Sequence, residues 1–365
     1  MIGALLLVAV QMTVQGTEPL TRYSFREIAM GCEVRIELFA HSHLEAARNA
    51  RVAFDRVKEL DERLSDYRAA SEVSRLCNDA GCATLITADL AAVISESLRV
   101  SRATEGAFDA SAGALSRVWR EARVRGARPT DQEIALARGQ CGFESLVLSA
   151  DPRRVTFKLS GIRLDFGAIG KGFAAQAAIE RMAASGASRA LCAIAGDIAC
   201  GDAPPDAAGW TIDVASELAD VAVRRVVLRN QSISTSGDAS QHLDVEGERF
   251  SHIFDPRTGR AVTRRIAATV VSRSGAVADA LATALCIDGE ALVARAAQIA
   301  QQCGEFEARV VELKAAYEGA LASVKITETP GWKSLQESPP ALVAMDQTAA
   351  TLASDSSGSQ EPHPK

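Results

Sequence analysis

The sequence predicts an α+β fold in which mixed or antiparallel sheets pack against long helices. Some windows repeat apolar residues every three or four positions, as amphipathic helices do, and others alternate apolar with polar residues, as half-buried strands do. The strand-like windows come in groups between the helical ones, which disfavours a doubly wound parallel sheet. The chain has 365 residues, of which 47% are hydrophobic, enough for a substantial core.

The elements follow in order along the chain. Glu33 to Phe39 alternates charged with apolar residues and predicts a strand, and Leu44 to Leu64 carries one apolar stripe and predicts a helix. Further helices are predicted over 88–104, 112–124, 131–138, 171–185, 276–300 and 305–318. Further strands, bounded by Gly, Asp, Asn or Pro, are predicted over 145–148, 155–159, 189–194, 211–214, 221–228, 250–254 and 267–272.

Both ends of the chain differ from this pattern. The apolar run Ile2 to Val10 precedes Val14-Gln15-Gly16, which is compatible with an export cleavage site, but a positively charged n-region is missing. The run is too short to span a membrane. Residues 1–19 are therefore either a leader or an ordinary buried segment. We expect one folded domain over 20–335 and a disordered tail over 336–365, which is rich in Ser, Ala and Pro without periodicity.

Charge and cysteine content restrict the function. The net charge is −6 and no basic block is present, so we expect no nucleic-acid partner. No Cys-x-x-Cys pair or histidine cluster indicates zinc. Cys77 and Cys82 could close a small surface disulfide if the chain is exported. Burial is expected for the cysteines in apolar surroundings, which are Cys32, Cys141, Cys192, Cys200 and Cys286.

A glycine-rich segment from Asp165 to Ala174 places Lys171 just before a predicted helix. Glycines let the backbone approach a phosphate, and a helix N-terminus favours an anion. The segment is not a P-loop, because Asp165 stands where the first glycine is required and glycine follows Lys171. A turn that merely packs a helix on a strand is the alternative.

Asp279 and Thr283 lie four residues apart in an apolar helical window and therefore share one helix face. A carboxylate and a hydroxyl are oxygen ligands of the kind that magnesium prefers. Alternatively, Asp279 caps the helix and Thr283 bonds back to a carbonyl one turn earlier.

Two further motifs offer polar groups. His252 lies on a predicted strand before a turn and could transfer a proton near neutral pH, or it could be a hydrogen-bonded structural residue. Gly106-Ala107-Phe108-Asp109 could form a binding loop, or Asp109 could be an ordinary helix cap.

Taken together, these motifs resemble the ApbE family of FAD:protein FMN transferases, over roughly residues 28 to 290. Several short motifs in the expected order are more specific than any one of them. The series is Met30-Gly31-Cys32, Leu64-Ser65-Asp66-Tyr67, Ser71-Glu72-Val73 with Asn78, Gly106 to Ser111, Asp165 to Ala174, Ala195-Gly196-Asp197-Ile198, Thr235-Ser236-Gly237-Asp238, Ser251 to Gly259, and Ala278 to Thr283.

The resemblance implies an ApbE-like, T-fold-related α+β domain with a defined site. The Ala168 carbonyl and the side chains of Asp279 and Thr283 would bind Mg²⁺, so that Asp279 is also a catalytic residue. His252 would act as the base for the acceptor hydroxyl. The residues expected to line the FAD site are Met30, Tyr67, Ala107, Phe108, Asp109, Lys171 and Ile253.

The activity implied by the resemblance is transfer of FMN from FAD to a Thr or Ser hydroxyl of a target protein, with release of AMP. The target would be an electron-transfer subunit on the exported, periplasmic side of the inner membrane. Two alternatives stay open. A flavin pyrophosphatase would split FAD with water at the same site, and a flavin-binding protein would keep the site without turnover.

Four positions depart from the family pattern. Cys32 and Ser111 stand where threonine is usual or common, Ala195 replaces a glycine, and Gln176 replaces an Asp. We expect these changes to alter binding detail while activity remains. The sequence indicates no function for the segment Thr329-Pro330-Gly331-Trp332.

Overall fold

The computed structural model describes residues 19–78, 83–151, 153–214, 218, 223–238, 241–314 and 323–336. Its centre is an eight-stranded sheet in which neighbouring strands run antiparallel. The strand order is β1 (Thr21–Ala29), β2 (Cys32–Ala40), β6 (Ala190–Ile194), β7 (Asp197–Cys200), β10 (Gln231–Gly237), β13 (Arg265–Ser272), β14 (Phe306–Lys314) and β15 (Ser323–Glu328). The α+β class with antiparallel sheets and long helices is confirmed.

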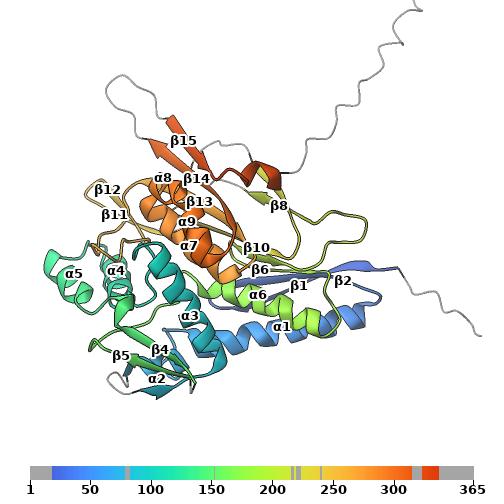
Figure 1. Cartoon of the computed structure of the whole chain (residues 1–365), viewed down its shortest axis with the longest axis horizontal. Coiled ribbons are helices and arrows are strands. Elements are labelled where there is room, and N and C mark those ends of the chain that lie inside the picture. Colours follow the sequence, from blue (N-terminus) through green and yellow to red (C-terminus); the bar gives the residue numbers. More distant parts are fainter. Residues whose placement is uncertain are drawn as a thin grey trace, which may run out of the picture.

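Long helices cover one face of this sheet, called here the helix face (Figure 1). They are α1 (His43–Leu64), α6 (Gly170–Ala184) and α7 (Gly275–Asp288). The main core lies between them and the strands, where Ile36 and Leu38 of β2 are completely buried. Outside α7 lie α3 (Ala88–Ala103), α8 (Glu290–Ala294) and α9 (Ala296–Cys303).

The opposite face of the sheet, called the far face, is covered by fewer elements. A two-stranded hairpin, β8 (Trp210–Val214) and β9 (Arg224–Leu228), packs there with the short 3₁₀ helix η2 (Trp332–Leu335). Trp332 is completely buried among apolar residues of the hairpin and the sheet. The segment 329–332, for which the sequence indicates no function, therefore helps to form this second core.

Shorter elements flank the sheet on the side of α4 (Gly113–Arg125) and α5 (Asp131–Arg138). They are α2 (Glu72–Asn78), η1 (Phe143–Ser145), the sheet of β3 (Thr84–Leu85), β5 (Arg153–Phe157) and β4 (Leu146–Ala150), and the hairpin of β11 (His242–Val245) and β12 (Glu248–Ser251). Among the described residues, no helix is long and apolar enough to span a membrane.

Local sequence explains where several elements begin. Helix α1 starts after Ser42, whose side chain accepts the Glu45 amide at 3.2 Å, and α5 starts with a capping box between Thr130 and Glu133. Strands β1 and β2 are joined by a two-residue turn with φ of 52° at Met30 and 73° at Gly31. Positive φ at both positions matches the twist of the flanking strands.

Several predicted elements are confirmed and two are wrong. The helices at 44–64, 88–104, 112–124, 131–138 and 171–185 and the strand at 33–39 are present within one residue or so of their predicted ends. The predicted helix 276–300 is broken at Gly289, whose φ is +56°, and again at Arg295, which gives α7, α8 and α9. The predicted helix 305–318 is wrong, because 306–314 form β14.

The error at β14 has a physical cause. Both faces of the strand are buried, so Val310 and Val311 are both apolar and the simple alternation of a half-buried strand is lost. The other predicted strands are present with shifted ends, and the first residues of 221–228 lie outside the described residues. Strands that the sequence reading missed are β1, β3, β7, β10, β11 and β15.

Nearly all of the predicted leader and tail lie outside the described residues. Cys77 is a free, buried thiol that accepts the Leu164 amide at 3.3 Å, and Cys82 lies outside the described residues. Cys192, Cys200 and Cys286 are buried as predicted, whereas Cys32 and Cys141 are only partly buried.

Candidate active site

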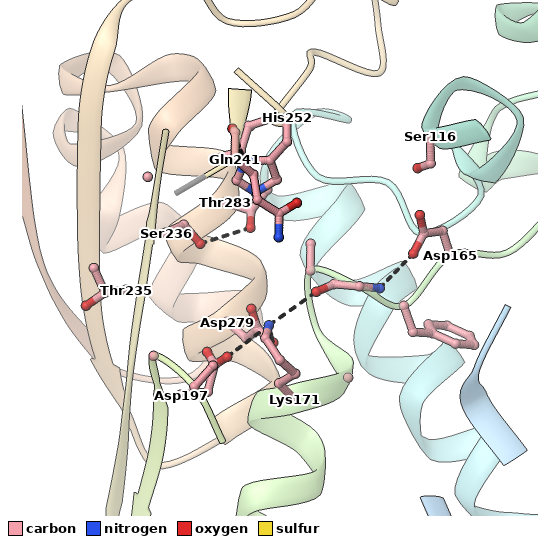
Figure 2. A pocket seen from close by; sticks show the side chains of 18 of the residues that line it. Ser116, Asp165, Lys171, Asp197, Thr235, Ser236, Gln241, His252, Asp279 and Thr283 are labelled. Carbon is pink, nitrogen blue, oxygen red and sulfur yellow. Dashed lines mark hydrogen bonds and ion pairs between the residues drawn. The ribbon is translucent and has the colours of Figure 1, made fainter. Parts of the chain in front are cut away.

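One pocket of about 1230 Å³ opens at the end of the main sheet, and every residue predicted for the site lines it. The residues come from distant parts of the chain: Met30 from the β1–β2 turn, Lys171 from the start of α6, and Asp279 from α7. Figure 2 shows the polar side chains facing one another across this pocket. The fold brings the predicted residues together, while their individual roles stay predictions.

Two glycines let the first turns of α6 and α7 touch. A Cβ atom on Gly172 would lie 2.1 Å from the Gly275 carbonyl oxygen, and one on Gly275 would lie 2.2 Å from the Gly172 carbonyl oxygen. Any side chain at either position would force the helices apart. The glycines that suggested a phosphate loop therefore also have a packing role, which was the alternative left open.

Asp279 is buried at this crossing, with 2% of its surface exposed. Its Oδ2 atom accepts the Gly172 amide at 3.1 Å and lies 3.8 Å from Lys171 Nζ. The Gly172 amide belongs to the first turn of α6 and has no acceptor in its own helix. Burial raises the pKa of the Asp279 carboxyl to about 7, and the nearby Asp197 carboxylate acts in the same direction.

Lys171 joins Asp279 to a residue that the sequence reading did not assign to the site. Its Nζ atom lies 2.9 Å from Asp197 Oδ2, and Asp197 is 3% exposed. Burial lowers the pKa of Lys171, but the carboxylates of Asp279 and Asp197 outweigh it and leave the pKa raised. Asp197 was visible in the Ala195-Gly196-Asp197 motif, but only the fold shows that it faces Lys171.

These buried groups fit a cation. Two carboxylates and one ammonium leave a net charge of −1 if all are ionised, and a buried unpaired charge is unfavourable. The Thr283 hydroxyl lies one turn beyond Asp279 and is 3.2 Å from Ser236 Oγ. Within the described part of the chain, the Ala168 carbonyl accepts no hydrogen bond. A carboxylate, a hydroxyl and a free carbonyl are suitable ligands for Mg²⁺.

The protein would supply only part of a coordination shell. Among the described residues, no group of three or more His, Cys, Asp and Glu side chains is arranged to hold a metal. Magnesium commonly takes one or two protein carboxylates and completes its octahedron with water and substrate phosphates. The site therefore suits a cation that arrives with a diphosphate.

His252 lies just after β12 at the pocket wall, above Thr283 in Figure 2. Its Nδ1 atom is 3.0 Å from the Gln241 carbonyl oxygen, which also accepts the His252 amide at 3.1 Å. A carbonyl only accepts, so Nδ1 carries the proton and Nε2 is the basic nitrogen of the neutral ring. Burial lowers the pKa of His252, and Arg123 and Lys171 add to the effect.

Tyr67 and the loop 107–109, which are also predicted to bind FAD, line another part of the same pocket. Tyr67 is 78% exposed, and its ring lies under the Arg120 guanidinium, 4.6 Å from the ring centroid. Arg120 is held in turn by Asp66 at 2.6 Å and Asp165 at 3.0 Å. An exposed aromatic ring kept in a fixed orientation offers a flat surface to another ring system.

The Asp109 carboxylate accepts several hydrogen bonds from the protein itself. Its Oδ1 atom accepts the Ser111 amide at 2.7 Å and hydroxyl at 2.6 Å, and Oδ2 accepts the Phe143 amide at 3.1 Å. Burial raises the pKa of this carboxyl despite those hydrogen bonds. The carboxylate thus orders the loop that carries Ala107 and Phe108. It is not the helix cap of the alternative prediction, because α4 begins after Ala112 without a side-chain cap.

Comparisons with known proteins identify the family of this chain. A model of the ApbE family matches residues 30–309. The chain belongs to the ApbE family. The FAD:protein FMN transferase of Vibrio cholerae is 28% identical over 269 residues, covering 72% of this chain and 80% of the relative. The enzyme of the same name from Haemophilus influenzae is 28% identical over 245 residues, covering 64% of this chain and 70% of the relative.

Solved structures of the ApbE family share the fold. The Pseudomonas stutzeri flavinyl transferase ApbE, in its apo form, superimposes with a TM-score of 0.72 at 27% identity, over 87% of this chain and 97% of that one. The flavin transferase ApbE from Vibrio cholerae gives a TM-score of 0.71 at 25% identity, over 87% of this chain and 100% of that one.

The structure shows the contacts or backbone conformation at three of the departures from the ApbE pattern. Gln176 Oε1 accepts the Gly275 amide at 2.7 Å, so an amide caps α7 where the family typically has an Asp. The Ser111 hydroxyl bonds Asp109 and also accepts the Gly142 amide at 2.9 Å, which a threonine could equally do. Ala195 has a φ of 52°, a conformation in which a glycine would be unstrained.

Proposed function

We propose that this chain transfers FMN from FAD to a Ser or Thr hydroxyl of an acceptor protein and releases AMP. The observation that carries the proposal is the meeting of Asp279, Thr283, Lys171 and His252 in one pocket, which the exposed ring of Tyr67 also lines. The name of its ApbE relatives, FAD:protein FMN transferase, supports the same reaction.

In the proposed reaction the acceptor oxygen attacks the FMN-side phosphorus of the FAD diphosphate. A new phosphorus–oxygen bond forms, the bond from that phosphorus to the AMP-side oxygen breaks, and AMP leaves with the bonding electrons. The acceptor proton passes to Nε2 of His252, because Nδ1 is engaged with the Gln241 carbonyl. Binding both partners in line accounts for much of the acceleration.

Positive charge near the diphosphate has two sources. Lys171 lies at the N-terminal turn of α6, where unpaired amides and the helix dipole also favour an anion. Asp279, Thr283 and the Ala168 carbonyl would hold Mg²⁺, which when bound would neutralise the diphosphate and stabilise charge that develops on its oxygens. Asp197 would keep the Lys171 ammonium beside the site.

The test is mass spectrometry of proteins incubated with this chain, FAD and MgCl₂. Extract from cells of the chain's own source that lack the chain would supply acceptors, and AMP would be measured in the same samples. We expect one protein to gain the mass of FMN minus water on a Ser or Thr, in equal amount to AMP. The same incubation with EDTA should give neither product.

Other outcomes would identify the alternatives. AMP and free FMN without any protein adduct would favour the pyrophosphatase. FAD binding without AMP would favour a flavin-binding protein. An adduct on a residue other than Ser or Thr would contradict the hydroxyl chemistry while keeping the transfer.

The acceptor and the compartment form a further part of the proposal. We propose an electron-transfer subunit on the exported side of the inner membrane as the acceptor, with 1–19 as a leader; the apolar run Ile2 to Val10 supports export. Cell fractionation followed by N-terminal sequencing tests this. A mature protein that begins at Met1 in the cytoplasm would contradict it.

A further inference from the structure

We infer that the acceptor polypeptide binds in an extended conformation on the far face of the sheet, along the edge of β8 that pairs with no other described strand. The inference rests on the proposed function, because a protein acceptor needs a surface of its own beside the FAD site. It assigns a role to a part of the pocket that no predicted site residue occupies.

The pocket continues from the cation site around the end of β10. Ser236 and Thr235 are successive residues of that strand and point to opposite faces. The Ser236 hydroxyl lies 3.2 Å from Thr283 on the helix face, whereas the Thr235 hydroxyl lies 3.0 Å from Thr269. Both residues line the same pocket, and Figure 2 shows Thr235 directed away from Thr283. The pocket therefore connects the two faces.

We call the part on the far face the acceptor groove. Its floor is formed by Ile198 of β7 with Ile233 and Thr235 of β10, and its wall by 212–214 of β8. The residues predicted to bind FAD come from other elements, and none of them lies on β7, β8 or β10. The whole pocket exceeds the roughly 300–1,000 Å³ usual for a small-molecule site, which leaves room for a second ligand.

The wall of the groove is a strand edge. Consecutive side chains of a strand point to opposite faces, yet Ile212, Asp213 and Val214 all line the pocket. Ile212 and Val214 are buried toward the sheet, and Asp213 is exposed on the other side of the strand. The pocket therefore borders the β8 backbone at these three residues. In the described part of the chain β8 pairs only with β9, and the other edge of β9 is bridged at Val226 to Gln336.

An unpaired edge of this kind favours an extended peptide. Its free amide and carbonyl groups can pair with an added strand, and pockets for alternate side chains then give specificity. The apolar floor at Ile198 and Ile233 would accept small or apolar side chains at alternate positions. A Ser or Thr at the end of such a segment would then pass around β10 toward Ser236 and Asp279.

The first test uses the acceptor protein identified by the mass-spectrometric assay above. Asp213→Pro removes one backbone amide from β8, and we expect the KM for the acceptor to rise at least tenfold while the Kd for FAD changes less than twofold. Val324→Pro places the same residue on β15, an edge strand outside the pocket, and should leave both constants unchanged. If Asp213→Pro fails to fold, Thr235→Arg, at an exposed position of the groove floor, should raise the acceptor KM instead.

The second test is amide hydrogen exchange with and without saturating acceptor. We expect exchange of the β8 amides to slow at least tenfold and that of the β15 amides to stay unchanged. Unchanged acceptor KM in folded variants would overturn the inference, as would a parallel loss of FAD affinity in Asp213→Pro. Protection of β8 that depends on chain concentration without acceptor would assign the groove to a second copy. A wild-type chain that modifies no protein would instead remove the proposed function, and the acceptor groove with it.

Discussion

The two faces of the main sheet both bury charged side chains, but they balance them differently. On the far face Glu37 is 5% exposed and lies within ion-pair distance of both Arg22 and Arg35. On the helix face two carboxylates, Asp197 and Asp279, share the single ammonium of Lys171. The far face is thus neutralised by the protein itself, whereas the helix face keeps a surplus of negative charge.

The difference distinguishes a structural ion pair from a binding site. A buried pair with sufficient partners orders the strands that carry it, and its net stabilisation is small. A buried charged group with insufficient partners destabilises the protein without its cation. Binding of the cation then stabilises the protein. Burial, together with the nearby Asp197 carboxylate, raises the pKa of Asp279 to about 7.

Replacing Asp279 should give the largest effect. Asp279→Ala removes a proposed cation ligand, and we expect FMN transfer to fall by at least about 10³-fold, equivalent to about 4 kcal/mol. Transfer rates measured across a MgCl₂ titration check this. Glu37→Gln on the far face is the matched control and should keep activity within about threefold. Wild-type rates in Asp279→Ala with EDTA present would contradict the cation site.

The next largest effect concerns stability. Trp332→Ala leaves a cavity in the second core, and we expect the free energy of unfolding to drop by about 3 kcal/mol. Urea denaturation measures the loss, and titration with FAD at low temperature should give an unchanged Kd for the folded fraction. A large loss of FAD affinity would mean that the two faces are not separable in function.

The third effect is a change in pH dependence. If neutral His252 is the base, kcat/KM rises with pH through the pKa of the free imidazole, which burial holds below the ordinary value of 6.5. Rates at saturating MgCl₂, where the cation keeps Asp279 ionised, should show this acid limb. His252→Ala should lower the rate about 10²-fold and abolish the limb. A limb that persists in the variant would belong to another group.

The smallest expected effect is a gain in stability. Ala195 is held at a φ of 52°, and relief of this strain outweighs the greater unfolded-state freedom of glycine, so Ala195→Gly should stabilise the fold by about 0.5–1 kcal/mol. Thermal unfolding measures the gain. Ala193→Gly, at a buried strand position in β6, should destabilise instead. Equal losses in both variants would show that the turn is unstrained.

Local patterns predicted much of this molecule. The single apolar stripe of α1 and the capping box of α5 depend on neighbours within a few residues, and both helices were predicted within one residue of their ends. The β14 prediction failed because burial on both faces removes the alternation that identifies a strand, and burial depends on distant elements. Strands β7 and β10 were missed because their polar residues serve the pocket and obscure the same pattern.

The sequence by itself determined the residue types of the site and their order along the chain, since the spacing of Asp279 and Thr283 or the glycines around Lys171 can be read directly. Only the tertiary structure decided which of these groups lie close enough to form ion pairs. Gly172 and Asp279 are 107 positions apart and meet because two glycines allow two helix ends to touch. The tertiary structure also placed β8 beside the pocket, where it pairs only with β9 among the described strands. Periodicity is a local property of the chain, whereas charge balance and unpaired edges depend on where the chain returns in space.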